Sequence, residues 1–237
     1  MRLSFPAEVW RGALPALVGL LPALDVARAL AMRVLIACES SGRVREAFRR
    51  RGHDAWSCDV LWAEDRSPYH YTGSILDHDI VKQGWDLLIA HPDCTFLTVS
   101  ANGHAMKQEW RIEARLSALH FVRALWAFPV KRKAIENPIG VLNTFWREPT
   151  QTIQPWEFGH KATKGTCLWL DGLEPLKPTN VVGPPPKEMT LEEKRIWNAV
   201  HRAAPGPDRW RIRSLTFEGI AEAMADQWGG IEQAVAA

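Results

Sequence analysis

WDLLIAHPDCTFLTVSANG, residues 85–103, carries the clearest structural signal in the chain. Residues 86–90 are mostly apolar and have the length and composition of a buried strand. The run ends at His91-Pro92, because a proline cannot continue a central ladder. Cys94 therefore follows the carboxyl end of a parallel strand, which is the edge where open α/β sheets bind ligands. A cysteine at this edge is either a small buried apolar side chain or a nucleophile.

A second stretch, KAIENPIG at residues 133–140, has a similar layout. Ala134 and Ile135 form a short strand-like run, and a carboxylate, an amide and a proline follow it. Parallel strands end at the same edge of a sheet, so we expect the functional groups of the two stretches to meet there. This second stretch favours the nucleophile interpretation of the cysteine.

The composition is that of a single soluble α/β domain. The chain has 237 residues, of which 46% are hydrophobic and 24% charged, and its net charge is only +2. Any nucleic-acid contact must therefore come from a local basic patch. The cysteines at positions 38, 58, 94 and 167 form no CxxC pair, which argues against a zinc finger or a disulfide framework and favours a reducing, cytoplasmic compartment. We expect no metal site, since these cysteines have no recognisable ligand spacing.

Residues 1–31 differ from the rest of the chain. Their apolar part, residues 11–31, is interrupted by Pro15 and Pro22 and is too short for a membrane span. A signal peptide is one interpretation, because arginines precede an apolar patch that ends in small residues. The interpretation we favour is an extension outside the native domain, since Met32 directly precedes a natural first strand. No membrane partner is expected.

From Met32 onward strand and helix signals alternate, which predicts a parallel sheet with helices on both faces. The expected strands are residues 34–37, 55–60, 86–90 and 134–135, and the expected helices are residues 43–51, 108–128, 191–201 and 217–228. Residues 61–72 read as a loop. Beyond residue 149, prolines divide the chain into short strands and loops.

The turn after the first strand reads Cys38-Glu39-Ser40-Ser41-Gly42. Small residues there let a ligand approach the backbone, and the N-terminus of the following helix offers free N–H groups. Asp59 ends the second expected strand and is placed to accept hydrogen bonds from a ribose diol. The alternative for Asp59 is an ordinary solvated loop aspartate.

The two loops at the sheet edge resemble those of the cytosine-5 DNA methyltransferases. That family carries Pro-Pro-Cys-Gln after one strand and Glu-Asn-Val after the next, and here the counterparts read Pro92-Asp93-Cys94-Thr95 and Glu136-Asn137-Pro138. The resemblance is closest to short methyltransferase-like proteins of phages and prophages, which have segments similar to PWEFGHKATKGTCLWL (155–170) and RSLTFEGIAEAMADQWG (213–229). It covers most of residues 32–230.

This resemblance implies a class I S-adenosylmethionine-dependent methyltransferase-like, Rossmann-like α/β fold over residues 32–237. Cys94 would add to carbon 6 of cytosine, Glu136 would donate a proton at the ring edge, and Asn137 would fix the loop. Thr95 would contact the substrate.

The resemblance also implies where S-adenosylmethionine binds. The turn at residues 38–42 would cradle its methionine part and Asp59 its ribose, with His91 and Pro92 bordering the site. A third acidic position should fall within residues 73–77. Serine stands there where relatives carry aspartate, and Asp77 is the substitute.

The sequence departs from the family at two positions beside the nucleophile. Asp93 replaces a proline, and a neighbouring carboxylate raises the pKa of a thiol. His91 would offset this if it were protonated or hydrogen-bonded to Asp93. Thr95 replaces a glutamine. The family's Gln-x-Arg-x-Arg segment has no clear equivalent, and the cations available to replace its arginine are Lys161, Lys164, Arg211 and Arg213.

The sequence thus predicts an enzyme that methylates carbon 5 of cytosine in DNA. Residues 141–215 leave room only for a small substrate-facing region, with basic and aromatic candidates at Trp146, Arg147, Trp156, His160, Lys161, Lys164 and Trp169. Two alternatives remain: a methyltransferase of free pyrimidine nucleotides, and a binding protein that has lost turnover. The oligomeric state is not indicated.

Overall fold

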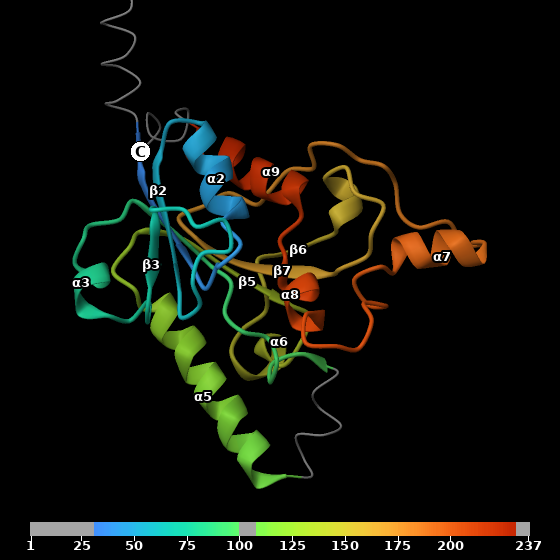
Figure 1. The fold of residues 1–237 in the computed structure, drawn as a ribbon, viewed down its shortest axis with the longest axis horizontal. Helices are drawn as coiled ribbons and strands as arrows, with labels where there is room; N and C mark the ends of the chain where they lie inside the picture. Colours follow the sequence, from blue (N-terminus) through green and yellow to red (C-terminus); the bar gives the residue numbers. More distant parts are fainter. Residues whose placement is uncertain (1–30, 100–107, 231–237) are drawn as a thin grey trace, which may run out of the picture. The chain divides into compact units, whose positions relative to one another are not determined.

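The computed structural model describes residues 31–99 and 108–230, so that most of the expected extension at residues 1–31 lies outside the described ranges. Within them one seven-stranded sheet has the order β3-β2-β1-β4-β5-β7-β6 (Figure 1). Its strands are β1 (Arg33–Ala37), β2 (Asp54–Asp59), β3 (His70–Thr72), β4 (Leu87–Ala90), β5 (Arg132–Pro138), β6 (Gln151–Ile153) and β7 (Thr166–Asp171).

The sheet is mixed, and the expectation of an all-parallel sheet is wrong for β7. β1 to β5 pair in parallel, whereas β7 is antiparallel to both β5 and β6. The connection from β6 to β7 has no crossover helix of the kind that parallel neighbours need. Without β7 the order is 3-2-1-4-5-6, that of the dinucleotide-binding fold, and its switch point lies between β1 and β4.

Helices cover both faces of the sheet, as predicted. Alternate residues of β1 explain this: Val34 and Ile36 join the core under α2 and α9, while Leu35 and Ala37 join the core under α5. The described helices are α2 (Arg43–Arg50), α3 (His78–Val81), α5 (Glu109–Trp126), α6 (Leu142–Phe145), the 3-10 turn η3 (Pro155–Glu157), α7 (Leu191–Trp197), α8 (Arg209–Ser214) and α9 (Glu218–Gly229). No helix in the described ranges is long and apolar enough to span a membrane.

Three local expectations are wrong. Residues 61–72 were expected to be a loop, but their last three form the edge strand β3. α7 ends at Trp197 rather than at residue 201. α8 has no counterpart among the expected helices, because none of its residues is buried and it therefore leaves no hydrophobic periodicity.

Lys133 of β5 is a buried cation that fixes the end of α5. Its ammonium donates hydrogen bonds of 2.9 Å to the carbonyl oxygens of both Trp126 and Phe128. These carbonyls lie at and just beyond the last turn of α5, where intrahelical partners are missing. A positive charge is also favourable at a helix C-terminus.

We expect Lys133→Met to lower the free energy of unfolding by about 1–3 kcal/mol, because the Trp126 carbonyl loses its Lys133 donor and the Phe128 carbonyl keeps only the N–H of Val130. Urea denaturation followed by circular dichroism measures this. Lys131→Gln is the matched control, since Lys131 is exposed and two residues away. Its effect should stay within about 0.5 kcal/mol. Equal stability of the two variants would contradict the assignment.

Candidate active site

The site begins where β4 and β5 stop pairing with one another. Their ladder ends at Ala90 and Ile135, after which β5 continues to Pro138 with β7 as its neighbour. The loop after β4 takes the place of the missing strand. Within it, the carbonyl of Pro92 accepts a 2.8 Å hydrogen bond from the Asn137 side chain. This bond ties the loop after β4 to β5. The family resemblance implies such a loop-fixing role for Asn137.

Gly140 lets the two loops approach closely. The N–H of Val141 donates to the Leu97 carbonyl at 2.8 Å, and Thr98 forms an isolated bridge with Gly140. A Cβ at position 140 would overlap the Leu97 carbonyl oxygen. The backbone of the cysteine loop can therefore pack on the chain after β5 only because this residue has no side chain.

Glu136 and His91 form a nearly buried pair. Nδ1 of His91 lies 3.2 Å from Oε2 of Glu136, and their side chains are 10% and 13% exposed, respectively. Burial raises the pKa of Glu136, but the hydrogen bond from His91 and the charges of Lys164 and His91 outweigh it, so its pKa falls below the usual value. Glu136 is therefore a carboxylate at neutral pH.

Two buried polar atoms of this cluster have no partner among the described residues. They are Nε2 of His91 and Oδ1 of Asn137. Buried polar atoms are nearly always hydrogen-bonded in folded proteins, so unpaired ones need an explanation. A bound ligand or water would supply it, and both atoms belong to residues expected at the site.

Cys94 lies in the same cluster and is partly buried. Burial raises the pKa of its thiol, and the charges of Glu136 and Asp93 add to the effect, while Lys164 and Arg213 lower it. The carbonyl of Cys94 accepts hydrogen bonds from two later N–H groups, which holds the loop as a compact turn. The thiol is thus within electrostatic reach of Glu136 and is mainly protonated at neutral pH.

Asp93 bonds within its own turn. Its Oδ1 accepts hydrogen bonds from the backbone N–H of Thr95 at 3.0 Å and from the Thr95 hydroxyl at 2.7 Å. His91 is hydrogen-bonded to Glu136 rather than to Asp93, so the hydrogen bond that was one of the two ways expected for it to offset this carboxylate is not formed. The hydroxyl of Thr95 is likewise engaged with Asp93 rather than free.

The structure separates the four candidate cations. Lys164 and Arg213 act electrostatically on Cys94, and Lys164 also acts on Glu136. Arg211 instead forms an ion pair with Glu64 at 2.7 Å. Lys161 is exposed and lies within electrostatic reach of Glu193 in α7. Lys164 and Arg213 are therefore the two cations beside the thiol.

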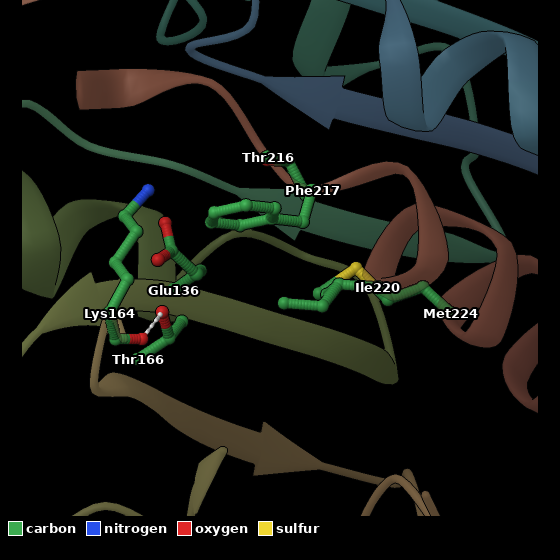
Figure 2. A pocket seen from close by; sticks show the side chains of 7 residues that line it. All are labelled: Glu136, Lys164, Thr166, Thr216, Phe217, Ile220 and Met224. Carbon is green, nitrogen blue, oxygen red and sulfur yellow. Dashed lines mark hydrogen bonds between the residues drawn. The ribbon is translucent and has the colours of Figure 1, made fainter. Parts of the chain in front are cut away.

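Figure 2 shows a small pocket next to Glu136. The Lys164 ammonium and the Glu136 carboxylate form its polar side, and the ring of Phe217 lies beside them. The remaining lining residues are Thr166, Thr216, Ile220 and Met224. Neither Phe217 nor any of these four residues was predicted as a site residue, although all five lie within the two segments that carry the family resemblance, residues 155–170 and 213–229.

Several residues expected on a substrate-facing surface have structural roles. Trp169 is buried, and Trp146 packs between it and Trp126. The ring of His160 accepts a 3.0 Å hydrogen bond from the N–H of Gly219 and so fixes the start of α9.

The turn after β1 differs from expectation at Glu39. Its carboxylate accepts hydrogen bonds from the N–H groups of Val44, at 2.7 Å, and Arg45, at 3.2 Å. The N-terminus of α2 therefore already holds an anionic group from the chain itself, and the expectation of free N–H groups is wrong for these two. Ser41 also donates to Glu39, at 3.4 Å.

Gly42 is required by packing with the chain itself. It adopts a left-handed φ of 73°, and a Cβ would overlap the guanidinium of Arg45 and the carboxylate of Asp65. Arg45 is fully buried and donates to Ser57 at 2.7 Å as well as to Asp65. Ser40 is hydrogen-bonded to Glu64, the residue next to Asp65.

Asp59 and Asp77 lie near one another at the end of β2. Both charges add to the burial that raises the pKa of Cys58 to about 12. Oδ1 of Asp59 accepts a 2.9 Å hydrogen bond from the N–H of Leu61. Beyond Asp59 the apolar side chains of residues 60–62 are exposed, and Trp62 most of all, at 81%.

Cys38 directly follows β1, which lies between β2 and β4 in the sheet. It adopts a left-handed φ of 58°, which is uncommon for a residue with a side chain. Burial raises the pKa of its thiol, and the charges of Asp59, Cys58 and Asp93 raise it further. Asp59 and Asp93 are thus both within electrostatic reach of the switch point.

No cluster of three or more histidine, cysteine or acidic side chains in the described part of the chain is arranged to hold a metal ion. In comparisons with known proteins, no family model and no curated protein matches the chain. The functional interpretation therefore depends on the geometry of the site and on the motif resemblance.

We expect Cys94 to react slowly with iodoacetamide at neutral pH and faster as the pH rises, because its raised pKa keeps the thiolate fraction small. Asp93→Asn should speed the reaction about two- to fivefold by removing a charge that opposes ionisation. Lys164→Met should slow it for the opposite reason.

Mass spectrometry of the Cys94 peptide gives these rates over a pH series, with the buried Cys167 as an internal reference. Asp54→Asn is the matched control, since Asp54 is the first residue of β2 and the candidate site lies at the opposite, carboxyl ends of the strands. Equal rates for Asp93→Asn, Asp54→Asn and the unaltered protein would show that the charge at position 93 does not govern the thiol.

Proposed function

We propose that this protein is an S-adenosylmethionine-dependent methyltransferase that acts on carbon 5 of cytosine in DNA. One observation carries the proposal: the partly buried thiol of Cys94 lies within electrostatic reach of Glu136, which is paired with His91 at the carboxyl edge of the sheet, next to the switch point. The motif resemblance assigns a nucleophile and a ring-binding carboxylate to these positions. Their proximity supports that assignment.

Cytosine carbon 5 is a poor nucleophile until a group adds at carbon 6. A thiolate at Cys94 would form a bond to carbon 6, and the displaced electron pair would move to ring nitrogen 3, where a proton neutralises it. The cations of Lys164 and Arg213 favour the thiolate. Carbon 5 would then bond the methyl group. Loss of the carbon 5 proton to solvent water would re-form the 5,6 double bond and expel the Cys94 thiolate, and ring nitrogen 3 would return its proton to Glu136.

Glu136 has two tasks in this scheme. As a carboxylate it accepts a hydrogen bond from the exocyclic amino group of cytosine, which orients the ring edge. It can donate to ring nitrogen 3 only after it has itself received a proton. Nδ1 of His91, at 3.2 Å, is the group placed to supply that proton when His91 is protonated.

The adenosine part of S-adenosylmethionine fits the end of β2. One oxygen of Asp59 is engaged with Leu61, and its second oxygen is available to a ribose hydroxyl. The exposed ring of Trp62 offers a stacking surface for a purine. The N-terminus of α2 is less suited to the methionine carboxylate, since Glu39 occupies it. When bound, the cofactor supplies the methyl group.

A binding protein without turnover is the second candidate. The raised pKa of Cys94, with the added charge of Asp93, is the observation that favours it. A protonated thiol adds to a pyrimidine far more slowly than a thiolate does. A methyltransferase of free nucleotides stays an alternative substrate assignment.

If Cys94 attacks the pyrimidine, DNA containing 5-fluorocytosine should form a covalent adduct with the protein when S-adenosylmethionine is present. Fluorine cannot leave carbon 5 as a proton does, so the adduct persists. Cys94→Ser should give none, because a serine hydroxyl is far less nucleophilic near neutral pH. Glu136→Gln should form it about 100-fold more slowly, since it has lost its acid–base group.

Denaturing gel electrophoresis detects this adduct, and 5-fluoro-dCMP in place of DNA tests the nucleotide alternative. Asp93→Pro, which restores the residue of the resembled family, should raise the rate. Cofactor binding without any adduct from either substrate would contradict the catalytic proposal and favour the binding protein.

We also expect Asp59→Ala to weaken S-adenosylmethionine binding by about 1–3 kcal/mol, through the loss of a charged hydrogen-bond acceptor. Isothermal titration calorimetry measures this. Asp77→Ala in the same assay tests whether the exposed Asp77 also contacts the cofactor. An unchanged affinity would remove the substituted residue from the site.

A further inference from the structure

α8 is a surface helix that contributes nothing to the core. Its sequence is RWRIRS, and none of its six residues is buried. Trp210 is 56% exposed and Ile212 is 51% exposed. Large apolar side chains cost free energy when they face water. A short helix that alternates them with three arginines therefore fits a surface that becomes covered when a partner binds.

Three contacts attach this helix to the candidate site. Arg211 pairs with Glu64, which is itself bonded to the turn after β1. Just beyond the helix, the carbonyl of Leu215 accepts a 3.3 Å hydrogen bond from Lys164, and that of Thr216 accepts a 2.9 Å bond from Arg43. The chain just after α8 thereby borders the pocket that contains Glu136, since Thr216 lines that pocket (Figure 2).

The helical repeat divides α8 into two faces. At 100° per residue Arg211 points one way, toward its partner Glu64. Arg209, Trp210, Ile212 and Arg213 share the opposite sector, in which the two apolar side chains flank the two arginines. Arg209 donates to the carbonyls of His201 and Ala203, whereas Arg213 makes no hydrogen bond or ion pair with another described residue.

Arg213 connects this face to the chemistry. Its positive charge lowers the pKa of Cys94, so the guanidinium lies within electrostatic reach of the thiol. An unpaired guanidinium matches the geometry and charge of a phosphate. A phosphate held there would belong to the nucleotide whose base faces Cys94 or to its neighbour.

We propose that the face formed by Arg209, Trp210, Ile212 and Arg213 binds a DNA strand, with a backbone phosphate on Arg213 and a base adjacent to the target stacked on Trp210. This inference rests on the proposed function for its choice of a nucleic acid. It assigns to α8 a strand contact beside the candidate site. A free nucleotide could occupy Arg213 but has no second base for Trp210.

The test measures binding of a fluorescein-labelled single-stranded oligodeoxynucleotide, about 16 nucleotides long, by fluorescence anisotropy over a series of salt concentrations. Arg213→Gln should weaken binding and make the slope of log K against log salt shallower by about 0.7, the value for one phosphate contact on a single strand. Trp210→Ala should weaken binding roughly 5- to 150-fold, as expected for one stacked base, with the slope unchanged.

Lys131→Gln is the charge control, because Lys131 is exposed at the amino end of β5, away from the site. It should bind as the unaltered protein does. Circular dichroism should show all three variants folded, since none alters a buried residue.

Unchanged binding by Arg213→Gln and Trp210→Ala would overturn the proposal. So would a protein that ignores the oligonucleotide but binds dCMP through Arg213, because that surface would serve a single nucleotide. The predicted losses in a protein that transfers no methyl group to DNA would support the surface and contradict the proposed enzymatic function instead.

Discussion

The structure depends on the missing backbone N–H of Pro92. β4 stops pairing with β5 at Ala90, directly before His91-Pro92, while β5 runs three residues further. The exposed flank of β5 is then filled by the loop that follows β4, through Asn137 and Gly140. This brings the imidazole of His91 and the thiol of Cys94 into one cluster with the carboxylate of Glu136, which lies 45 positions after His91 in the chain.

The charges in the cluster have opposite effects on the ionisation of Glu136 and of Cys94. His91 and Lys164 hold Glu136 ionised despite its burial, and that same negative charge helps to keep Cys94 protonated. Only Lys164 and Arg213 act in favour of the thiolate. A substrate that shields or protonates Glu136 would therefore ease ionisation of Cys94 at the same time, which would couple ring binding to activation of the nucleophile.

The sequence was informative wherever one residue type carried the structural signal. Proline at 92 and the apolar run before it located the end of β4, and this is confirmed. Whatever depended on contacts between distant residues was not predictable. The direction of β7, the capping role of Glu39 and the separation of Lys164 from Arg211 all follow from tertiary partners. α8 was missed because it buries nothing.

The packing of Gly42 against Arg45 has an evolutionary consequence. The guanidinium of Arg45 occupies the space that a Cβ at position 42 would need, so the two sites cannot change independently. A side chain at 42 would need both a shorter residue at 45 and a displaced Asp65, and it would still carry the strain of the left-handed φ. The shorter residue would also leave Ser57 and Asp65 without their donor. Glycine at 42 should therefore be retained for as long as Arg45 keeps its bonds to Ser57 and Asp65.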